Sequence, residues 1–163
     1  MKIKLTKLRY EEHTLELVRE NGTREQAVLN TKTFLFHDFL HYCVETLADL
    51  RNSFWGSLAA GKALKELSMR MEDPSPEKIF LASSTEAGTT EMVVGVLTGV
   101  VRGGASAKDA IAVLSNIASA KGEVVPAWCT EQLIEKVQNR MRELLGEWNS
   151  LPHEGSMTLE FPL

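Results

Sequence analysis

The chain has 163 residues, of which 44% are hydrophobic and 25% are charged, and this composition is typical of one globular domain with a buried core. Its formal net charge is −4, which argues against nucleic acid or an anionic membrane as a main partner, because both attract basic surfaces. We therefore expect a single domain over residues 1–163.

The cysteines and the apolar segments indicate the compartment. Cys43 and Cys129 form no CxxC pair, and two cysteines do not make a disulfide framework in a domain of this size. The N-terminus is charged, and the most apolar run, Met92–Val101, is too short to cross a bilayer. We expect a soluble cytoplasmic protein.

The first thirty residues alternate between polar and apolar side chains, as β-strands do. Asn21-Gly22 predicts a hairpin with a two-residue loop, because both central positions of a type I′ turn need a positive φ. Such a loop would place Leu15 opposite Val28. These two residues would then share one face of the hairpin, and Arg19 would lie on the other face.

From Thr31 onward the apolar period becomes that of a helix, with Thr31 or Thr33 as the expected cap. The apolar stripe between residues 34 and 50 consists of Phe36, Leu40, Cys43, Leu47 and Leu50. A second helical stretch is predicted over Phe54–Met71, and the prolines of Glu72–Glu77 form the loop that ends it.

The valine-rich run Thr85–Gly104 is predicted to be a buried helix, because it is long, lacks alternation and ends at two glycines. Gly95, Gly99 and Gly103 recur every four residues and would form a groove that lets a neighbouring helix approach closely. The alanine-rich segment between Ser106 and Gly122 is the expected neighbour, so that the two helices form an αα-hairpin.

The end of the chain returns to the sheet. A long amphipathic helix is predicted after Thr130, and residues 155–162 then alternate as a closing strand does. We predict an α+β fold in which a small antiparallel sheet packs against four or five helices. The N-terminal β-hairpin region (1–30) and the C-terminal strand would form the sheet, and residues 31–149 would supply the helices.

One candidate site lies on the helix around residues 34–50. His37, His41 and Glu45 follow one another at every fourth residue, and at about 100° per residue they form one ridge at the border of the apolar face. Histidines at i and i+4 place both imidazoles over one point, as in helical zinc or iron sites. Glu45 would be a third metal ligand, or it would hold His41 in one tautomer, and Asp38 would do the same for His37.

The same residues also have an interpretation without a metal. Histidines at the border of an apolar face often pack their rings on the core and leave their nitrogens in water. A His–Glu pair at i, i+4 stabilises a helix by a few tenths of a kcal/mol without any further role. No HExxH motif occurs, and His13 and His153 are the only other histidines in the chain.

His37-Asp38 resembles the doublet of the HD phosphohydrolases, which are helical metalloenzymes. That family also requires histidine and aspartate ligands on other helices. Here His13 falls in a predicted strand and no downstream aspartate matches, so we do not assign the chain to that family.

A second resemblance rests on both ends of the chain. It combines an HDxxHYxVE helix with a C-terminal tail, and the residues are His37-Asp38, His41-Tyr42, Val44-Glu45, Leu151-Pro152, Leu159-Glu160 and Pro162. The combination is similar to a group of bacterial proteins without an assigned activity. The resemblance implies a bacterial cytoplasmic protein and implies no chemistry.

Two functions therefore stay open. The first is a non-enzymatic binding or assembly module, which would include a homo-oligomer. The second is a metal-dependent, hydrolase-like enzyme that uses the ridge of histidines and carboxylates. A carboxylate from another helix, such as Glu86 or Glu91, that meets the histidines in a cleft would favour the enzyme. A flat, solvated ridge would exclude it.

Overall fold

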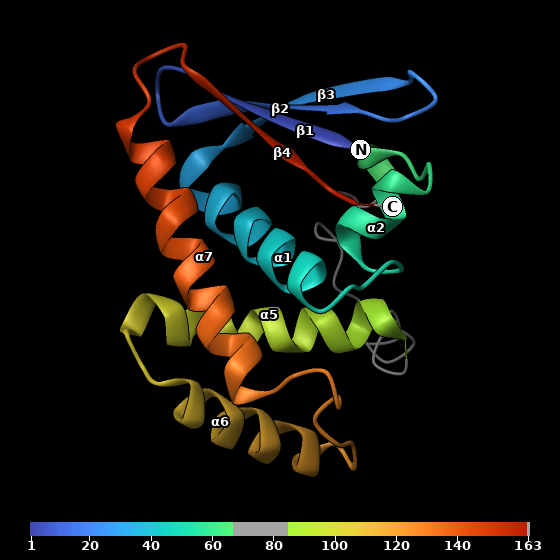
Figure 1. The fold of residues 1–163 in the computed structure, drawn as a ribbon, viewed down its shortest axis with the longest axis vertical. Coiled ribbons are helices and arrows are strands. Elements are labelled where there is room, and N and C mark those ends of the chain that lie inside the picture. Colours follow the sequence, from blue (N-terminus) through green and yellow to red (C-terminus); the bar gives the residue numbers. More distant parts are fainter. Residues whose placement is uncertain (67–84, 163) are drawn as a thin grey trace.

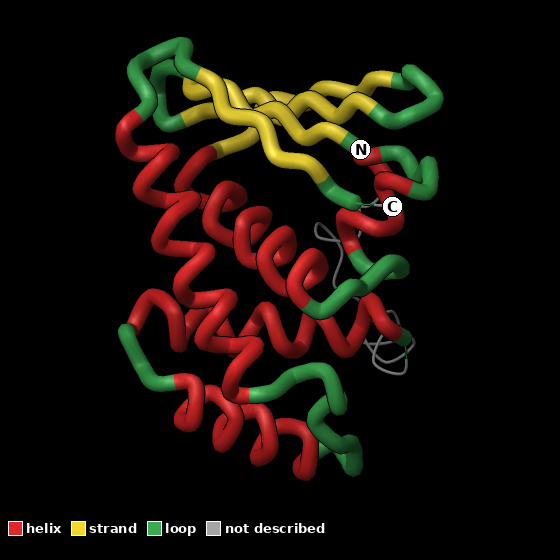
Figure 2. Tube along the Cα trace, viewed as in Figure 1, coloured by secondary structure: helices red, strands yellow, loops and turns green. Residues whose placement is uncertain are grey.

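The computed structural model of the chain describes residues 1–66 and 85–162. Within them, a four-stranded antiparallel sheet forms one layer and the helices lie on one side of it (Figure 1, Figure 2). This arrangement confirms the predicted α+β fold. None of the helices in these two ranges combines the length and the apolar character that a membrane span needs.

The sheet has the strand order β3-β2-β1-β4. Its strands are β1 (Lys2–Lys7), β2 (Glu12–Val18), β3 (Arg24–Asn30) and β4 (Ser156–Glu160). The C-terminal strand pairs with β1, so it closes the sheet as predicted. One face is buried against the helices, and its main residues are Ile3, Leu5, Leu15, Leu17, Met157 and Leu159.

The predicted register of the hairpin between β2 and β3 is wrong by one residue. Leu15 lies opposite Ala27 rather than Val28. The Arg19 backbone N–H donates to the Thr23 carbonyl oxygen at 3.0 Å, which leaves a loop of three residues, Glu20 to Gly22. Gly22 takes a positive φ of 83°, and the Asn21 side chain accepts a hydrogen bond from the Thr23 backbone N–H at 3.0 Å. One extra residue reverses the faces of β3, and Val28 is therefore 57% exposed.

Arg19 also lies on the buried face, against the prediction, because it follows Leu15 and Leu17 at every second position and such side chains share one face of a strand. Its guanidinium donates to the backbone oxygens of Leu58 and Lys62, at 2.6 and 2.8 Å, and forms an ion pair with Glu25. The second carboxylate oxygen of Glu25 accepts from the backbone N–H of Leu64 at 2.8 Å. This partly buried ion pair therefore joins the hairpin to the segment around residues 58–64.

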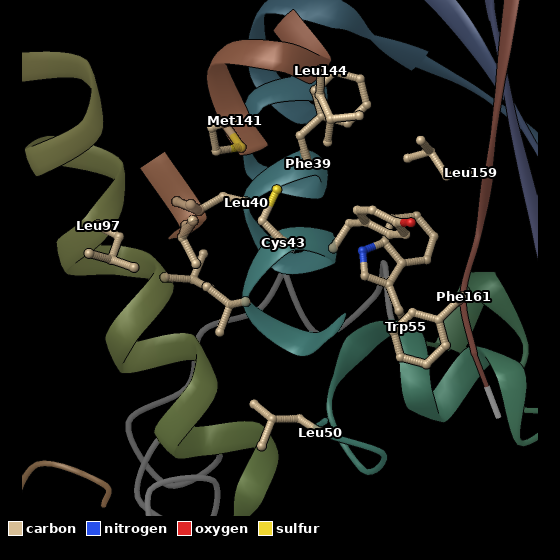
Figure 3. Close-up of a cluster of buried hydrophobic side chains, with 14 of the residues drawn as sticks. Phe39, Leu40, Cys43, Leu50, Trp55, Leu97, Met141, Leu144, Leu159 and Phe161 are labelled. Carbon is tan, nitrogen blue, oxygen red and sulfur yellow. The ribbon is translucent and has the colours of Figure 1, made fainter. Parts of the chain in front are cut away.

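Helix α1 (Phe36–Leu47) is the central helix of the domain. A short π-helical turn, η1 (Thr31–Leu35), leads into it from β3, and Asn30 caps this turn in place of the two threonines named above. The side chains of α1 contact α7, α5, β4 and α2 (Figure 3). Every residue from Asp38 to Glu45 is buried, so α1 has no solvated face over this stretch.

Helix α2 (Phe54–Ala59) is much shorter than the predicted helical stretch over Phe54–Met71. The chain leaves the helix at Ala60, and Gly61 takes a φ of +105°, which breaks the helix before it resumes at residue 64. The remainder of that stretch, and the loop predicted at Glu72–Glu77, lie outside the described residues.

Between residues 85 and 162, the described residues form the helices α5 (Glu86–Gly103), α6 (Ala107–Ala120) and α7 (Glu131–Ser150). Helices α5 and α6 form the predicted αα-hairpin, which lies on the side of α1 that faces away from the sheet (Figure 1). The glycines of α5 do not lie at the contact between α5 and α6. A Cβ atom at Gly95, Gly99 or Gly103 would meet no described atom within 4 Å, so the predicted close approach of α6 at these glycines is wrong.

The glycine at position 56 allows a close backbone approach, because a Cβ atom there would collide with the carbonyl group of Arg51. We expect Gly56→Ala to lower the free energy of unfolding by about 1–3 kcal/mol, measured by chemical denaturation.

The matched control is Gly146→Ala in α7, where a Cβ atom meets no atom within 4 Å. This change should raise the stability by about 0.5–1 kcal/mol through helix propensity alone. Equal effects of the two substitutions would show that the approach to Arg51 does not constrain the fold.

Candidate metal centre

The polar ridge of α1 lies largely inside the protein. Only 1% of His41, 0% of Glu45 and 5% of Asp38 is exposed. His37 is 28% exposed and marks the open end of the ridge. The expected solvated border does not apply to these residues, because neighbouring elements cover α1 from several sides. Buried polar groups of this kind need partners, and the next contacts supply them.

Glu45 orients the imidazole of His41. Its Oε1 atom lies 3.1 Å from His41 Nδ1, and its Oε2 atom accepts the backbone N–H of Gly56 at 3.1 Å. Both carboxylate oxygens are therefore engaged away from the open end of the ridge. With the proton of the neutral imidazole on Nδ1, Nε2 keeps a free lone pair. Of the two roles that the sequence left open for Glu45, this contact fits the tautomer-holding one.

A carboxylate from α5 completes the cluster. Glu91 Oε1 lies 3.2 Å from His41 Nε2, and Glu91 Oε2 lies 3.9 Å from His37 Nε2. The two imidazole rings have centroids 4.6 Å apart. One potential ligand atom from each of His37, His41 and Glu91 lies within 4.8 Å of the other two. Ligands about 2.1 Å from a tetrahedral ion are about 3.4 Å apart, so a small contraction would enclose a metal ion.

The Nε2 atom of His41 is buried and has no hydrogen-bond partner of adequate geometry in the described part of the chain. Glu91 is near enough for an ion pair, at 3.2 Å, but it is poorly aligned for a hydrogen bond. A buried nitrogen without a directed partner is unusual in a native protein. Here it faces a carboxylate and a second imidazole, which together form a ligand set.

The position of Glu91 depends on how α5 begins. Thr85 caps the helix by accepting the backbone N–H of Gly88 at 3.1 Å. The Glu86 carboxylate accepts from the backbone N–H of Asn52, and the Thr90 hydroxyl contacts the Ser53 hydroxyl at 2.7 Å. These contacts tie α5 to the segment after α1, and Glu91 then faces the histidines.

Of the two carboxylates named from the sequence, Glu91 and not Glu86 meets the ridge.

Asp38 lies near two histidines. Its Oδ1 atom is 4.0 Å from His37 Nδ1, which is an ion-pair distance and too long for the hydrogen bond of an orienting partner. Its charge also acts on His13, whose pKa is lowered because burial outweighs the Asp38 carboxylate. His13 is fully buried and bonds the Thr31 hydroxyl at 3.1 Å, so it does not join the cluster. His153 is exposed in the loop before β4.

The electrostatics of the cluster favour a cation at His41. Burial alone would lower the pKa of His41, but the Glu45 and Glu91 carboxylates outweigh it and raise the pKa to about 9. Burial also opposes ionisation of Glu91, yet the close His41 imidazole and the charge of His37 hold its pKa below the usual range. Two carboxylates therefore stabilise positive charge at this point, whether a proton or a metal ion carries it.

Comparisons of the chain with known proteins give no information about its function. No protein-family model, no curated protein and no solved structure matches the chain. Any function must therefore be inferred from the side chains of the cluster.

The raised pKa of His41 predicts how stability depends on pH without a metal. The ordinary value is 6.5 and the folded value is about 9, so folding favours the protonated form. The resulting stabilisation is fully present below pH 6.5 and is lost as the pH rises through 9. We expect a loss on the order of 2 kcal/mol, because the half-exposed Glu91 contributes less than a buried carboxylate.

The measurement is the free energy of unfolding against pH in the presence of EDTA. His41→Gln should remove the dependence over this range, and His153→Ala, which alters an exposed imidazole, should keep it. A wild-type curve that stays flat over the range would contradict the ionised cluster.

Proposed function

We propose that the protein binds one divalent transition-metal ion through His37, His41 and Glu91 and uses it as a Lewis acid in a hydrolytic reaction. The observation that supports this most strongly is the meeting of Glu91 from α5 with both imidazoles of α1, with His41 Nε2 buried and lacking a directed partner. Two histidines and one carboxylate are the ligand set of catalytic zinc sites that keep a fourth position for water.

The surrounding carboxylates support the same proposal. Glu45 would hold the Nδ1 proton of His41, and the Asp38 carboxylate, 4.0 Å from His37 Nδ1, would add negative charge beside His37. Carboxylates behind metal-binding histidines fix the ring orientation and raise the basicity of the ligand nitrogen. A divalent cation would also take the place of the proton on His41 and offset the negative charge that Glu45 and Glu91 concentrate there.

The exposure of the cluster supports a reacting role over a purely structural one. His41 is buried, but Glu91 is 55% exposed and His37 is 28% exposed, so the cluster opens to solvent on one side. A metal-bound water there would have its pKa lowered towards about 7 and would become a nucleophile at neutral pH. The free, buried thiols of Cys43 and Cys129 support a reducing, cytoplasmic setting.

Metal binding is tested on untagged protein. We expect elemental analysis and calorimetry with zinc to give about one ion per chain. Glu91→Gln should abolish or severely weaken binding, by more than the roughly 10–100-fold that loss of an orienting partner costs, while Glu45→Gln should fall within that range. Because Glu91 is half exposed, its substitution should leave the fold intact, which circular dichroism would check.

The matched controls are Glu135→Gln on the exposed face of α7 and His153→Ala in the loop before β4. Both should bind zinc as the wild type does. If Glu91→Gln and Glu135→Gln bind equally well, or if zinc, manganese and iron all fail to bind, the cluster is only an ion-pair network.

Hydrolysis is a separate measurement. The zinc-loaded protein should hydrolyse activated carboxylic or phosphoric esters, with a rate that increases as a bound water with a pKa of about 7 ionises. Glu91→Gln at the same zinc concentration should fall to the background rate. Stoichiometric metal without any metal-dependent turnover would instead support the non-enzymatic binding module.

A further inference from the structure

A second feature lies on the αα-hairpin, beside the cluster. Helices α5 and α6 border an open, shallow groove with a volume of about 530 Å³. Gly95, Val96 and Gly99 line one side, Val113 and Ile117 line the other, and Glu91 lies at one end. The groove is mostly apolar and shallow, which suits a packed protein surface better than an enclosed small molecule.

Of the described residues that line the groove, only Glu91 and Lys121 are charged. No Asp, Glu, Lys or Arg occurs between Met92 and Val101 or between Ala110 and Ala120, although both segments have exposed positions. The solvent side of α7 differs sharply, and its charged residues are Glu131, Glu135, Lys136, Arg140, Arg142, Glu143 and Glu147. Depletion of charge distinguishes the core of a protein interface from ordinary surface.

The glycines of α5 fit the same interpretation. Cβ atoms at Gly95 and Gly99 would meet nothing within 4 Å, so no contact with a described residue requires glycine there. Glycine weakens a helix relative to alanine, and the described chain gains nothing from it at these positions. A second helix that lies in the groove would gain a close approach to the α5 backbone.

The chemistry of α6 identifies the partner. Asp109, Val113, Ile117 and Lys121 are spaced by four residues and form one ridge with an acidic end, an apolar middle and a basic end. Val113 is 43% exposed, and Ile117 is only partly buried. The opposite charges at its two ends make this ridge complementary to an antiparallel copy of itself.

We propose that two copies of the chain associate through this surface, with the α6 ridge of each copy in the α5–α6 groove of the other. About a two-fold axis between Val113 and Ile117, Asp109 of one copy would face Lys121 of the second, and Val113 would face Ile117. Every contact then occurs twice, as a two-fold symmetric interface requires. This dimer does not depend on the metal centre, and it is tested without metal.

The test is sedimentation equilibrium in EDTA, from low micromolar to several hundred micromolar protein. The wild type should form a dimer. Val113→Glu should weaken dimerisation by roughly 100-fold or more, because it buries a charge without a partner. Gly99→Leu should do the same by filling the groove, and as a better helix former it should not destabilise the monomer. Val28→Glu places the same charge on an exposed valine of β3 and should leave the dimer unchanged.

Cross-linking tests the orientation. A mixture of the single variants Val113→Cys and Ile117→Cys should oxidise to a disulfide-linked dimer faster than either variant alone, because the two native thiols are buried. A monomer at all concentrations, a dimer insensitive to Val113→Glu and Gly99→Leu, or faster cross-linking of one variant alone would each overturn the proposal. The proposal would also be overturned if another segment of the same chain filled the groove, or if the groove bound only a different protein.

Discussion

The burial of α1 on several sides is the constraint on which the rest of the structure depends. A helix with one polar ridge normally turns that ridge to solvent. Here the sheet, α7, α5 and α2 surround it, so Asp38, His41 and Glu45 must find their partners inside the protein. The contact of Glu45 with Gly56 and that of Glu91 with His41 follow from this requirement. The burial of α1 therefore completes the core and also brings the polar side chains of the cluster together.

The predictable parts of the fold are those that local periodicity determines. Alternation gave the strands, the four-residue spacing gave α1 and α7, and the separation of strands from helices gave the α+β class. The register of β3 depended instead on the number of residues in one loop, and the Asn21 side chain favours three rather than two. The burial of α1 depended on how many elements surround the helix. The periodicity of one helix carries no information about that number.

The candidate site divides in the same way. The proximity of His37 and His41 is a property of one helix, so their spacing was sufficient to predict it. Glu91 lies fifty positions further along the chain than His41, and its arrival depends on how the start of α5 contacts Asn52 and Ser53. Nothing in the local sequence separated it from Glu86, which lies little more than one helical turn away. The role of Glu45 likewise depended on the backbone of Gly56, from another segment.

The pairing of β1 with β4 has a consequence for how the chain folds. β1 is an interior strand, and its neighbour on one side is β4, with Leu5 opposite Met157. Met1 and Phe161 also exchange two backbone hydrogen bonds, at 2.8 and 2.9 Å. During synthesis β1 therefore stays an open edge until residues 156–160 have left the ribosome. A sheet whose final pairing joins strands far apart in the sequence forms late. The nascent chain therefore carries an uncovered strand that can pair with other chains.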